Sequence, residues 1–156
     1  MLNIQKINKK SVELDIIKEL FVEYLYELNE DLCFQSFDSE LENPLKKYGE
    51  PNGFLLLGYW NDEPAGCIGL QQLPQQGICE MKRLFVRPRF RHFGVGAELI
   101  SALLKEAATM GYKKMVLDTL ERLQPAIQLY KKHGFVNTSP YYTNPLDNVM
   151  YMEKML

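Results

Sequence analysis

A cluster of arginines and two glycines lies between a predicted strand and a predicted helix in the middle of the chain. In the stretch RLFVRPRFRHFGVGAELI the strand ends at Val86 and the helix starts near Gly94. The first amide groups of such a helix lack partners in the chain, so they can bind an anion. Gly94 and Gly96 let a ligand approach the backbone, and Arg89 and Arg91 can add charged hydrogen bonds to phosphate oxygens. We therefore expect a site for a polyphosphate.

Two common phosphate-binding motifs do not match this stretch. A Walker A loop needs Lys and then Ser or Thr after its last glycine, but Ala97 and Glu98 follow Gly96. The dinucleotide-binding fingerprint needs a further Gly or Ala where Leu99 stands, and it belongs to a parallel βαβ unit. The strand here follows predicted hairpins, which argues against both a kinase-like NTPase and a Rossmann domain.

The elements around this stretch predict one α/β (α+β) domain over residues 1–156, with a mixed and mostly antiparallel sheet of about six to seven strands and about four helices. The strand-like runs are LNIQKI, GFLLLGYW, AGCIGLQQL, CEMKRLFV, KKMVLDT, GFVNTSPYY and NVMYMEKML. The short connections NDEP and PQQG predict antiparallel hairpins. Helices are expected from Ser11, around 38–47, over Val95–Met110, and from near Pro125 to Gly134.

The bulk properties favour a soluble, cytoplasmic protein. The chain has 156 residues, of which 46% are hydrophobic, and contains neither a signal-peptide core nor an apolar run long enough to cross a membrane. Cys33, Cys67 and Cys79 lie far apart without metal-ligand spacing, so we expect free buried thiols and no metal site. A sequence pI of about 5.7 argues against a nucleic-acid partner.

Opposite charges are segregated along the sequence. Glu19–Leu45 holds eight acidic residues and no basic one, whereas Met81–Ala97 holds five basic residues and no acidic one. Such segregation can steer charged ligands, although charge runs are also common on solvated faces.

The sequence motif Arg91-x-x-Gly94-x-Gly96-Ala97 resembles the acyl-CoA pyrophosphate loop of the GNAT superfamily of N-acetyltransferases. The similarity extends over nearly the whole chain, including MVLDT, AIQLYKKHGF and the closing YMEKML. It implies an enzyme that moves an acetyl group from acetyl-CoA to a primary amine of a small molecule or peptide, by direct attack through a tetrahedral intermediate and without a metal.

The resemblance also implies which residues contact the cosubstrate. The diphosphate would rest on the backbone of the loop, comprising Arg91, His92, Phe93, Gly94, Val95, Gly96 and Ala97. The pantetheine arm would pair with the strand formed by Leu84, Phe85 and Val86. Asp118 and Thr119 could bond the pantetheine amides or merely begin a turn. Lys82 and Arg83 should lie on opposite faces of a strand, so we expect at least one of them to be structural.

Two side chains are candidates for proton transfer. Glu80 lies eleven residues before Arg91, where some family members carry a catalytic glutamate, so it could act as general base directly or through water; the alternative is a solvated strand residue. Tyr130 matches the tyrosine that protonates the coenzyme A sulfur in many of these enzymes, or it is a core aromatic. A backbone N–H near Phe85 or Val86 is the expected oxyanion donor.

Family members hold the acceptor between the first two helices and the loop that joins the last strands. Here these segments contain Tyr24, Tyr26, Phe34 and Phe37 on one side and PYYTNPLDN, with Tyr142, on the other. An acidic, aromatic-lined wall favours a cationic amine. The competing function is a non-catalytic acyl-CoA-binding regulatory module. The aromatic C-terminal strands could also form the edge of a homodimer.

Overall fold

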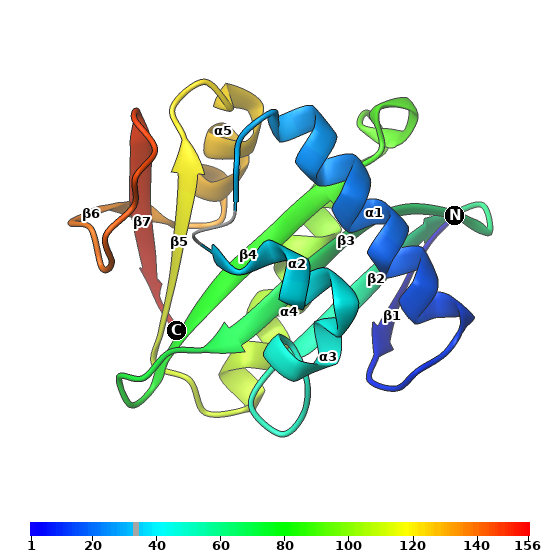
Figure 1. Cartoon of the computed structure of the whole chain (residues 1–156), viewed down its shortest axis with the longest axis horizontal. Helices are drawn as coiled ribbons and strands as arrows, with labels where there is room; N and C mark the ends of the chain where they lie inside the picture. The colour runs from blue at the N-terminus through cyan, green and yellow to red at the C-terminus, as the bar shows by residue number, and fades with distance from the viewer. Residues whose placement is uncertain (33–34) are drawn as a thin grey trace.

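A seven-stranded sheet forms the middle layer of the computed structural model, which describes residues 1–32 and 35–156. The strand order is β1-β2-β3-β4-β5-β7-β6, and every neighbouring pair is antiparallel except β4 and β5 (Figure 1). The strands are β1 (Leu2–Ile7), β2 (Phe54–Trp60), β3 (Glu63–Gln72), β4 (Ile78–Val86), β5 (Lys114–Leu120), β6 (Val136–Thr138) and β7 (Val149–Met155). The predicted α/β class and mixed sheet are confirmed.

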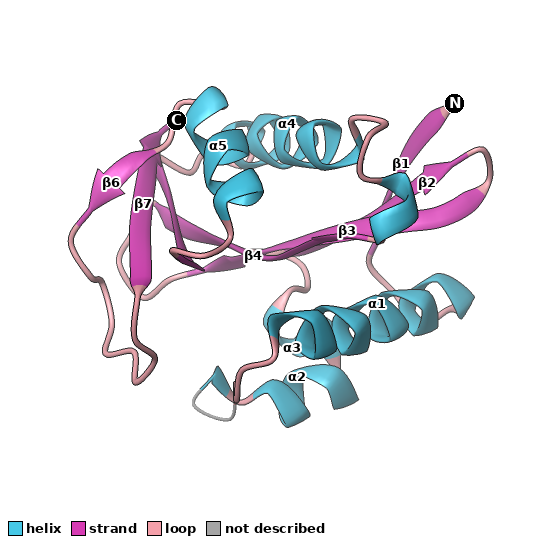
Figure 2. Ribbon diagram, turned by 90° about the horizontal axis from the view of Figure 1, so that it is seen from above, coloured by secondary structure: helices cyan, strands magenta, loops and turns pink. Residues whose placement is uncertain are grey.

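Helices cover both faces of the sheet (Figure 2). One face carries α1 (Val12–Leu28), α2 (Phe37–Glu42) and α3 (Pro44–Lys47), and the other carries α4 (Val95–Thr109) and α5 (Gln124–Lys132). The helix predicted over 38–47 is divided in two, because Pro44 lacks an N–H and suits a first helical position. No helix in the described ranges is long and apolar enough to span a bilayer.

Local sequence signals explain several element boundaries. The Ser11 side chain accepts a hydrogen bond from the Leu14 N–H at 3.2 Å and so caps α1 as expected. Asn61 and Asp62 adopt positive φ angles of 48° and 67°, which suit the tight turn between β2 and β3. The strand predicted from GFVNTSPYY is only Val136–Thr138, because the rest of that run leaves the sheet.

Two apolar cores lie on the two faces of the sheet, and each contains one described cysteine. Cys79 belongs to the core under α4 and α5, whereas Cys67 belongs to the core under α1. Both thiols are free and buried, as predicted, and burial raises the pKa of Cys79 to about 12. Cys33 lies outside the described residues.

The strands β4 and β5 pair only at their beginning. Ile78–Glu80 lies in parallel register with Lys114–Val116, and beyond that point the two strands diverge (Figure 1). The divergent strand ends create a gap in the middle of the sheet.

A β-bulge lies in β4 at the edge of this gap. Phe85 is opposite Cys67, but Lys82 is opposite Gly69, so an extra residue is inserted around Arg83. Arg83 adopts a left-handed backbone with φ 60°. The extra residue interrupts the alternation of side chains, and both Lys82 and Arg83 therefore project toward the segment between α1 and α2. The expectation that they lie on opposite faces is wrong for this reason.

Candidate active site

A cavity of about 80 Å³ lies where β4 and β5 diverge. Its walls come from both strands, from α1 and α5, and from the segment between β6 and β7. The polar side chains in the wall belong to Tyr24, Gln35, Lys82, Arg83, Asp118, Thr119, Tyr130 and Asn144. Four of them, Tyr24, Asp118, Thr119 and Tyr130, are site residues predicted from the sequence, and the fold brings these four together.

The turn before α4 presents unpaired backbone amides. After the short 3-10 helix η2 (Pro88–Phe90), the chain turns through Gly94 with φ 77° and enters α4. Within the described part of the chain, five N–H groups of this turn have no hydrogen-bond partner, those of His92, Gly94, Val95, Gly96 and Ala97. Such a row of donors at the positive end of a helix suits a diphosphate.

Close packing behind the turn favours glycine at Gly96. A Cβ on Gly96 would stand 3.2 Å from Leu129 Cδ2 and 3.6 Å from Val86 Cγ2. The start of α4 is therefore pressed against α5 and the end of β4. The predicted residue Val95 is buried and can offer only its amide, whereas His92 and Phe93 are exposed.

The arginine side chains around the turn bind carboxylates of α1 and β3. Arg91 donates to the Val86 carbonyl at 2.8 Å and to Glu27 at 2.5 Å. Arg89 lies 2.9 Å from Glu63. These two pairs are well exposed and hence weak, so their guanidinium groups can still turn to a phosphate.

The segregated charges of the sequence pair with one another in the fold. The acidic residues Glu19, Glu23, Glu27, Glu30 and Glu40 each form an ion pair with a basic residue. Four of these five pairs are made with arginines of β4 and the turn, because α1 and α2 lie beside the end of β4. The separation of charge in the sequence thus has a structural cause and no longer singles out a cationic acceptor.

The backbone of β4 directs one amide into the gap. The Arg87 N–H donates to the Ala65 carbonyl at 2.8 Å. Because paired and unpaired residues alternate along an antiparallel ladder, the Phe85 amide faces β3 and the Val86 amide faces away from it. Of the two predicted oxyanion donors, Val86 is the one oriented toward the gap.

Tyr130 lies in α5 with its side chain in the cavity wall. Its ring packs edge-on against Phe135 at a centroid distance of 6.1 Å. Burial raises the pKa of Tyr130, and the charge of Asp118 raises it further. The hydroxyl therefore stays protonated at neutral pH and can act as a donor.

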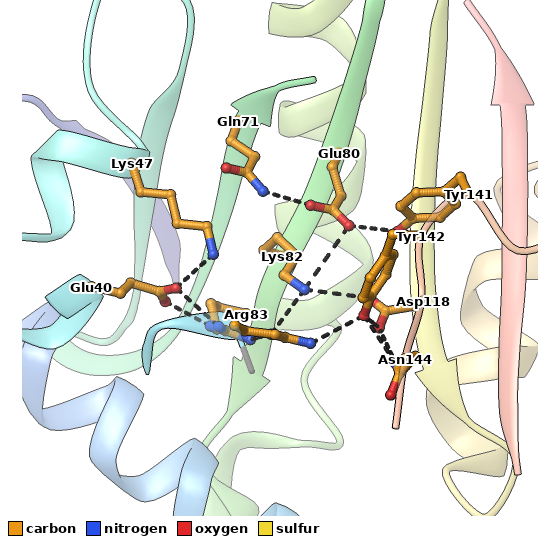
Figure 3. A network of polar contacts seen from close by, with 11 residues as sticks. Glu40, Lys47, Gln71, Glu80, Lys82, Arg83, Asp118, Tyr141, Tyr142 and Asn144 are labelled. Atoms are coloured by element: carbon orange, nitrogen blue, oxygen red, sulfur yellow. Dashed lines mark hydrogen bonds and ion pairs between the residues drawn. The ribbon is translucent and has the colours of Figure 1, made fainter. Parts of the chain in front are cut away.

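Glu80 lies directly behind the cavity wall, and its carboxylate accepts two hydrogen bonds. Gln71 Nε2 donates at 2.6 Å and the Tyr141 hydroxyl donates at 2.5 Å, and the residue is 3% exposed (Figure 3). Burial raises the pKa of Tyr141, and the charge of Glu80 adds to this effect. Glu80 is thus held by two neutral donors, with Lys82 Nζ 4.0 Å away, and it does not line the cavity, so a proton from the cavity could reach it only through a bridging group.

Asp118 is the carboxylate that lines the cavity. The Tyr142 hydroxyl donates to it at 2.5 Å, and Lys82 Nζ lies 3.4 Å away. Burial raises the pKa of Tyr142, with a further contribution from the charge of Asp118. Tyr142 was predicted to contact the amine substrate, and in the structure its hydroxyl binds Asp118. Asn144 in turn donates to the Tyr142 oxygen at 2.9 Å.

Arg83 forms a buried ion pair with Glu40 of α2. Its Nε and Nη2 donate to the two carboxylate oxygens at 2.6 and 2.9 Å, and Lys47 adds a bond at 2.9 Å. Burial alone would raise the pKa of Glu40, but hydrogen bonds and charges from Arg83 and Lys47 outweigh burial and lower it. Phe37 packs on the Arg83 guanidinium, 5.2 Å from ring centroid to Cζ. This cluster ties α2 to β4.

The other predicted aromatic residues of the acceptor wall differ in position. Tyr24 lines the cavity and packs edge-on against Phe85, whereas Tyr26 is 80% exposed and faces solvent. Phe34 lies outside the described residues.

Sequence reasoning did not find several residues of this polar network. The missed residues are Gln35, Glu40, Lys47, Gln71, Tyr141 and Asn144. Three of them, Gln35, Tyr141 and Asn144, lie outside the α-helices and strands, where the sequence has no periodic pattern. The acid run around Glu40 and the PYYTN segment were visible as groups, but nothing in the sequence indicated which members turn inward.

Comparisons with known proteins identify the family. The acetyltransferase (GNAT) family matches residues 15–135. An uncharacterized N-acetyltransferase of Schizosaccharomyces pombe is 46% identical over 141 residues, covering 90% of this chain and 86% of the relative. The chain belongs to the GNAT acetyltransferase family, and this membership together with the fold supports an acyltransferase.

Solved structures agree with this fold. A GNAT acetyltransferase from Staphylococcus aureus superposes with a TM-score of 0.79 over 99% of both chains at 21% identity. The PaiA N-acetyltransferase from Thermoplasma acidophilum, solved in complex with coenzyme A, gives a TM-score of 0.73 over 100% of this chain and 99% of that one at 16% identity.

We predict that Glu40→Gln destabilises the protein by about 3 kcal/mol at neutral pH, because it leaves the buried Arg83 without its counter-charge. This corresponds to a loss of roughly 6–12 °C in Tm by differential scanning calorimetry. The matched control is Glu42→Gln, which removes the same charge from an exposed position of α2.

The pH dependence of the same variant gives a second readout. Since the folded-state pKa of Glu40 lies below its ordinary value of 4.5, its contribution is fully present above pH 4.5 and is lost as pH falls through the lower value. The Tm gap between wild type and Glu40→Gln should therefore close in acid. An equal gap at every pH, or an equal loss in Glu42→Gln, would contradict this role.

Proposed function

We propose that this protein is an acetyl-CoA-dependent N-acetyltransferase that acetylates a primary amine of a small molecule or peptide. The observation that carries the proposal is the row of unpaired amides at the start of α4, next to the gap between β4 and β5. Membership of the GNAT family and the coenzyme A complex of the PaiA relative support this cosubstrate.

The residues around the gap fit the parts of acetyl-CoA. The diphosphate would rest on the amides of His92 and of residues 94–97, and Arg91 could exchange its exposed bond to Glu27 for a charged bond to phosphate. The pantetheine arm would enter the gap along β4, where the Val86 amide is oriented, and Asp118 and Thr119 lie on the opposite strand. Acetyl-CoA supplies an activated acetyl group as a thioester, and the protein supplies alignment and proton transfer.

The amine must lose a proton before or during its attack. An alkyl amine with a pKa of about 10.4 is mostly protonated at pH 7, which costs roughly 4.6 kcal/mol, whereas an α-amino group costs about 1 kcal/mol. The leaving thiol, with a pKa of about 8.5, needs roughly 2 kcal/mol of help. Accepting the amine proton is therefore the larger task for an alkyl amine.

The reaction forms a C–N bond and breaks the C–S bond of the thioester. We assign the amine proton to Glu80, reached through a water molecule because Glu80 lies behind the cavity wall. The Val86 N–H is assigned to the oxyanion that develops on the acetyl oxygen. Tyr130, whose pKa is raised by burial, gives a proton to the departing sulfur.

The direct test is release of free coenzyme A from acetyl-CoA in the presence of a broad panel of primary amines. Turnover that depends on the amine supports the transferase. Tight binding of coenzyme A without turnover of any amine would instead favour a non-catalytic acyl-CoA-binding module. Absence of both binding and turnover would contradict each function.

We predict that Gly94→Ala weakens coenzyme A binding about tenfold or more. A side chain at φ 77° costs roughly 1–2 kcal/mol in the left-handed region, and relief of that strain would redirect the amides of the turn. Isothermal titration calorimetry with coenzyme A measures the change.

The matched control is Gly111→Ala at the opposite end of α4. Gly111 has φ 94° and, like Gly94, has open space around the position of a Cβ. Both variants should lose similar stability, but only Gly94→Ala should lose affinity. Equal coenzyme A affinity in the two variants would show that the turn does not hold the diphosphate.

Replacing the candidate base should affect turnover and leave cosubstrate binding intact. Glu80→Gln keeps the shape of the side chain and a hydrogen-bonding oxygen but cannot accept the amine proton. We expect kcat to fall by about 10²–10⁴ at neutral pH, with KM for acetyl-CoA unchanged. A wild-type rate would remove Glu80 from the mechanism.

Removing the candidate acid should affect departure of the thiol. Tyr130→Phe deletes one hydroxyl from the cavity wall, and we expect kcat to fall on the order of 100-fold. An acyl donor with a more acidic thiol should recover much of this rate, because its leaving group needs less protonation. A variant that retains full activity would identify Tyr130 as a core aromatic.

A further inference from the structure

Two buried cations in the cavity wall converge on one neutral oxygen. The side chains of Lys82 and Arg83 are 6% and 1% exposed. Lys82 Nζ and Arg83 Nη1 both donate to Gln35 Oε1, at 3.0 and 2.9 Å. Both cationic side chains thus donate hydrogen bonds to the same point. A carboxylate oxygen at that point would accept two charged hydrogen bonds.

The two ion pairs that the Lys82 ammonium forms in this arrangement are long. Its nearest carboxylate oxygens belong to Asp118 at 3.4 Å and Glu80 at 4.0 Å (Figure 3). Both distances exceed the roughly 2.7–2.9 Å typical of charged N–H···O bonds. The bond to Gln35 is the only one of ordinary length that Lys82 makes with the described residues. A buried ammonium with one bond of ordinary length keeps hydrogen-bonding capacity for an acceptor group on a ligand.

The two nearby carboxylates, in contrast, are held by short bonds from neutral donors. Tyr141 and Gln71 donate to Glu80, and Tyr142 donates to Asp118. These carboxylates therefore have hydrogen-bond donors other than Lys82.

Arg83 adds further donors to the same wall. Three of its five N–H groups are used, two by Glu40 and one by Gln35, and no bond to the described residues is made by the other two. The unused hydrogen-bonding capacity of Lys82 and Arg83 suits an acceptor group on a ligand.

We propose that the amine substrate carries a carboxylate next to its amine, as an α-amino acid does, and that Lys82 and Arg83 bind this carboxylate in place of the Gln35 side-chain oxygen. The proposal rests on the acetyltransferase function proposed above and names the class of its acceptor. The carboxylate would anchor one end of the acceptor on β4 and leave the amine free to face the gap. A polyamine would instead set a second positive charge against Lys82 and Arg83, which is unfavourable.

The test compares α-amino acids with their own carboxamides in steady-state kinetics. Each pair shares its side chain and amine position and differs in the charge of the carboxyl group. Amidation also lowers the amine pKa, so intrinsic reactivity favours the amide and works against the expected result. For the best acceptor pair of the panel, wild-type kcat/KM should favour the acid by about 10- to 100-fold, the strength of a charged hydrogen bond.

The variant Lys82→Met should lower this acid-to-amide ratio to about 1, mainly by raising KM for the acid. The ratio is informative even if the absolute rate changes. Lys46→Met, which removes the same charge from an exposed position of α3, should keep the wild-type ratio. Preference for the amide in wild type, or an unchanged ratio in Lys82→Met, would overturn the proposal.

Equilibrium binding separates this proposal from the function on which it rests. Calorimetry of the protein with an N-acetyl amino acid and with the matching N-acetyl amide needs no turnover. Tighter binding of the acid, lost in Lys82→Met, supports the proposal. If amides or polyamines are acetylated and acids neither react nor bind, the acetyltransferase function stands and the carboxylate site is wrong.

Discussion

The left-handed backbone at Arg83 is the constraint on which the candidate site depends. One extra residue in β4 changes the order in which side chains alternate, so Lys82 and Arg83 face the same side of the sheet. Beside this bulge, β4 separates from β5 and leaves a gap. Parallel strands that stayed paired to their ends would leave neither a cavity nor a free amide at Val86. The bulge lies beside this gap and places two cations in the cavity wall.

Such an arrangement has an energetic cost that the surrounding segments offset. A non-glycine residue in a sparsely populated backbone region costs about 1–3 kcal/mol, and burying a guanidinium costs more unless it is paired. Glu40 supplies the counter-charge through two hydrogen bonds, and the ring of Phe37 covers the guanidinium. Both residues belong to α2, so docking of this helix and the conformation of β4 support each other. Arg83 also lines the cavity, so its ion pair with Glu40 links the stability of the fold to the shape of the site.

The sequence predicted the scaffold well because its signals are local. Periodicity, the cap at Ser11 and the short hairpin connections identify nearly all elements, and the glycines at 94 and 96 locate the turn before α4. The interior of the site was less accessible. A bulge at Arg83 is set by strand register and by the pairing with Glu40, neither of which has a signature in a single sequence. The same holds for Tyr141, which lies far from Glu80 along the chain and reaches it only because the segment after β6 leaves the sheet.

We propose that the backbone of the turn before α4 and the free edge of β4 together hold acetyl-CoA. The most direct measurement is the change in backbone amide chemical shifts when coenzyme A is titrated into the ¹⁵N-labelled protein. We expect large shifts at His92, at residues 94–97 and at Val86, with little change in β1 at the far edge of the sheet. Saturable binding that leaves these amides unshifted and moves another surface, or no shift at any amide, would contradict it.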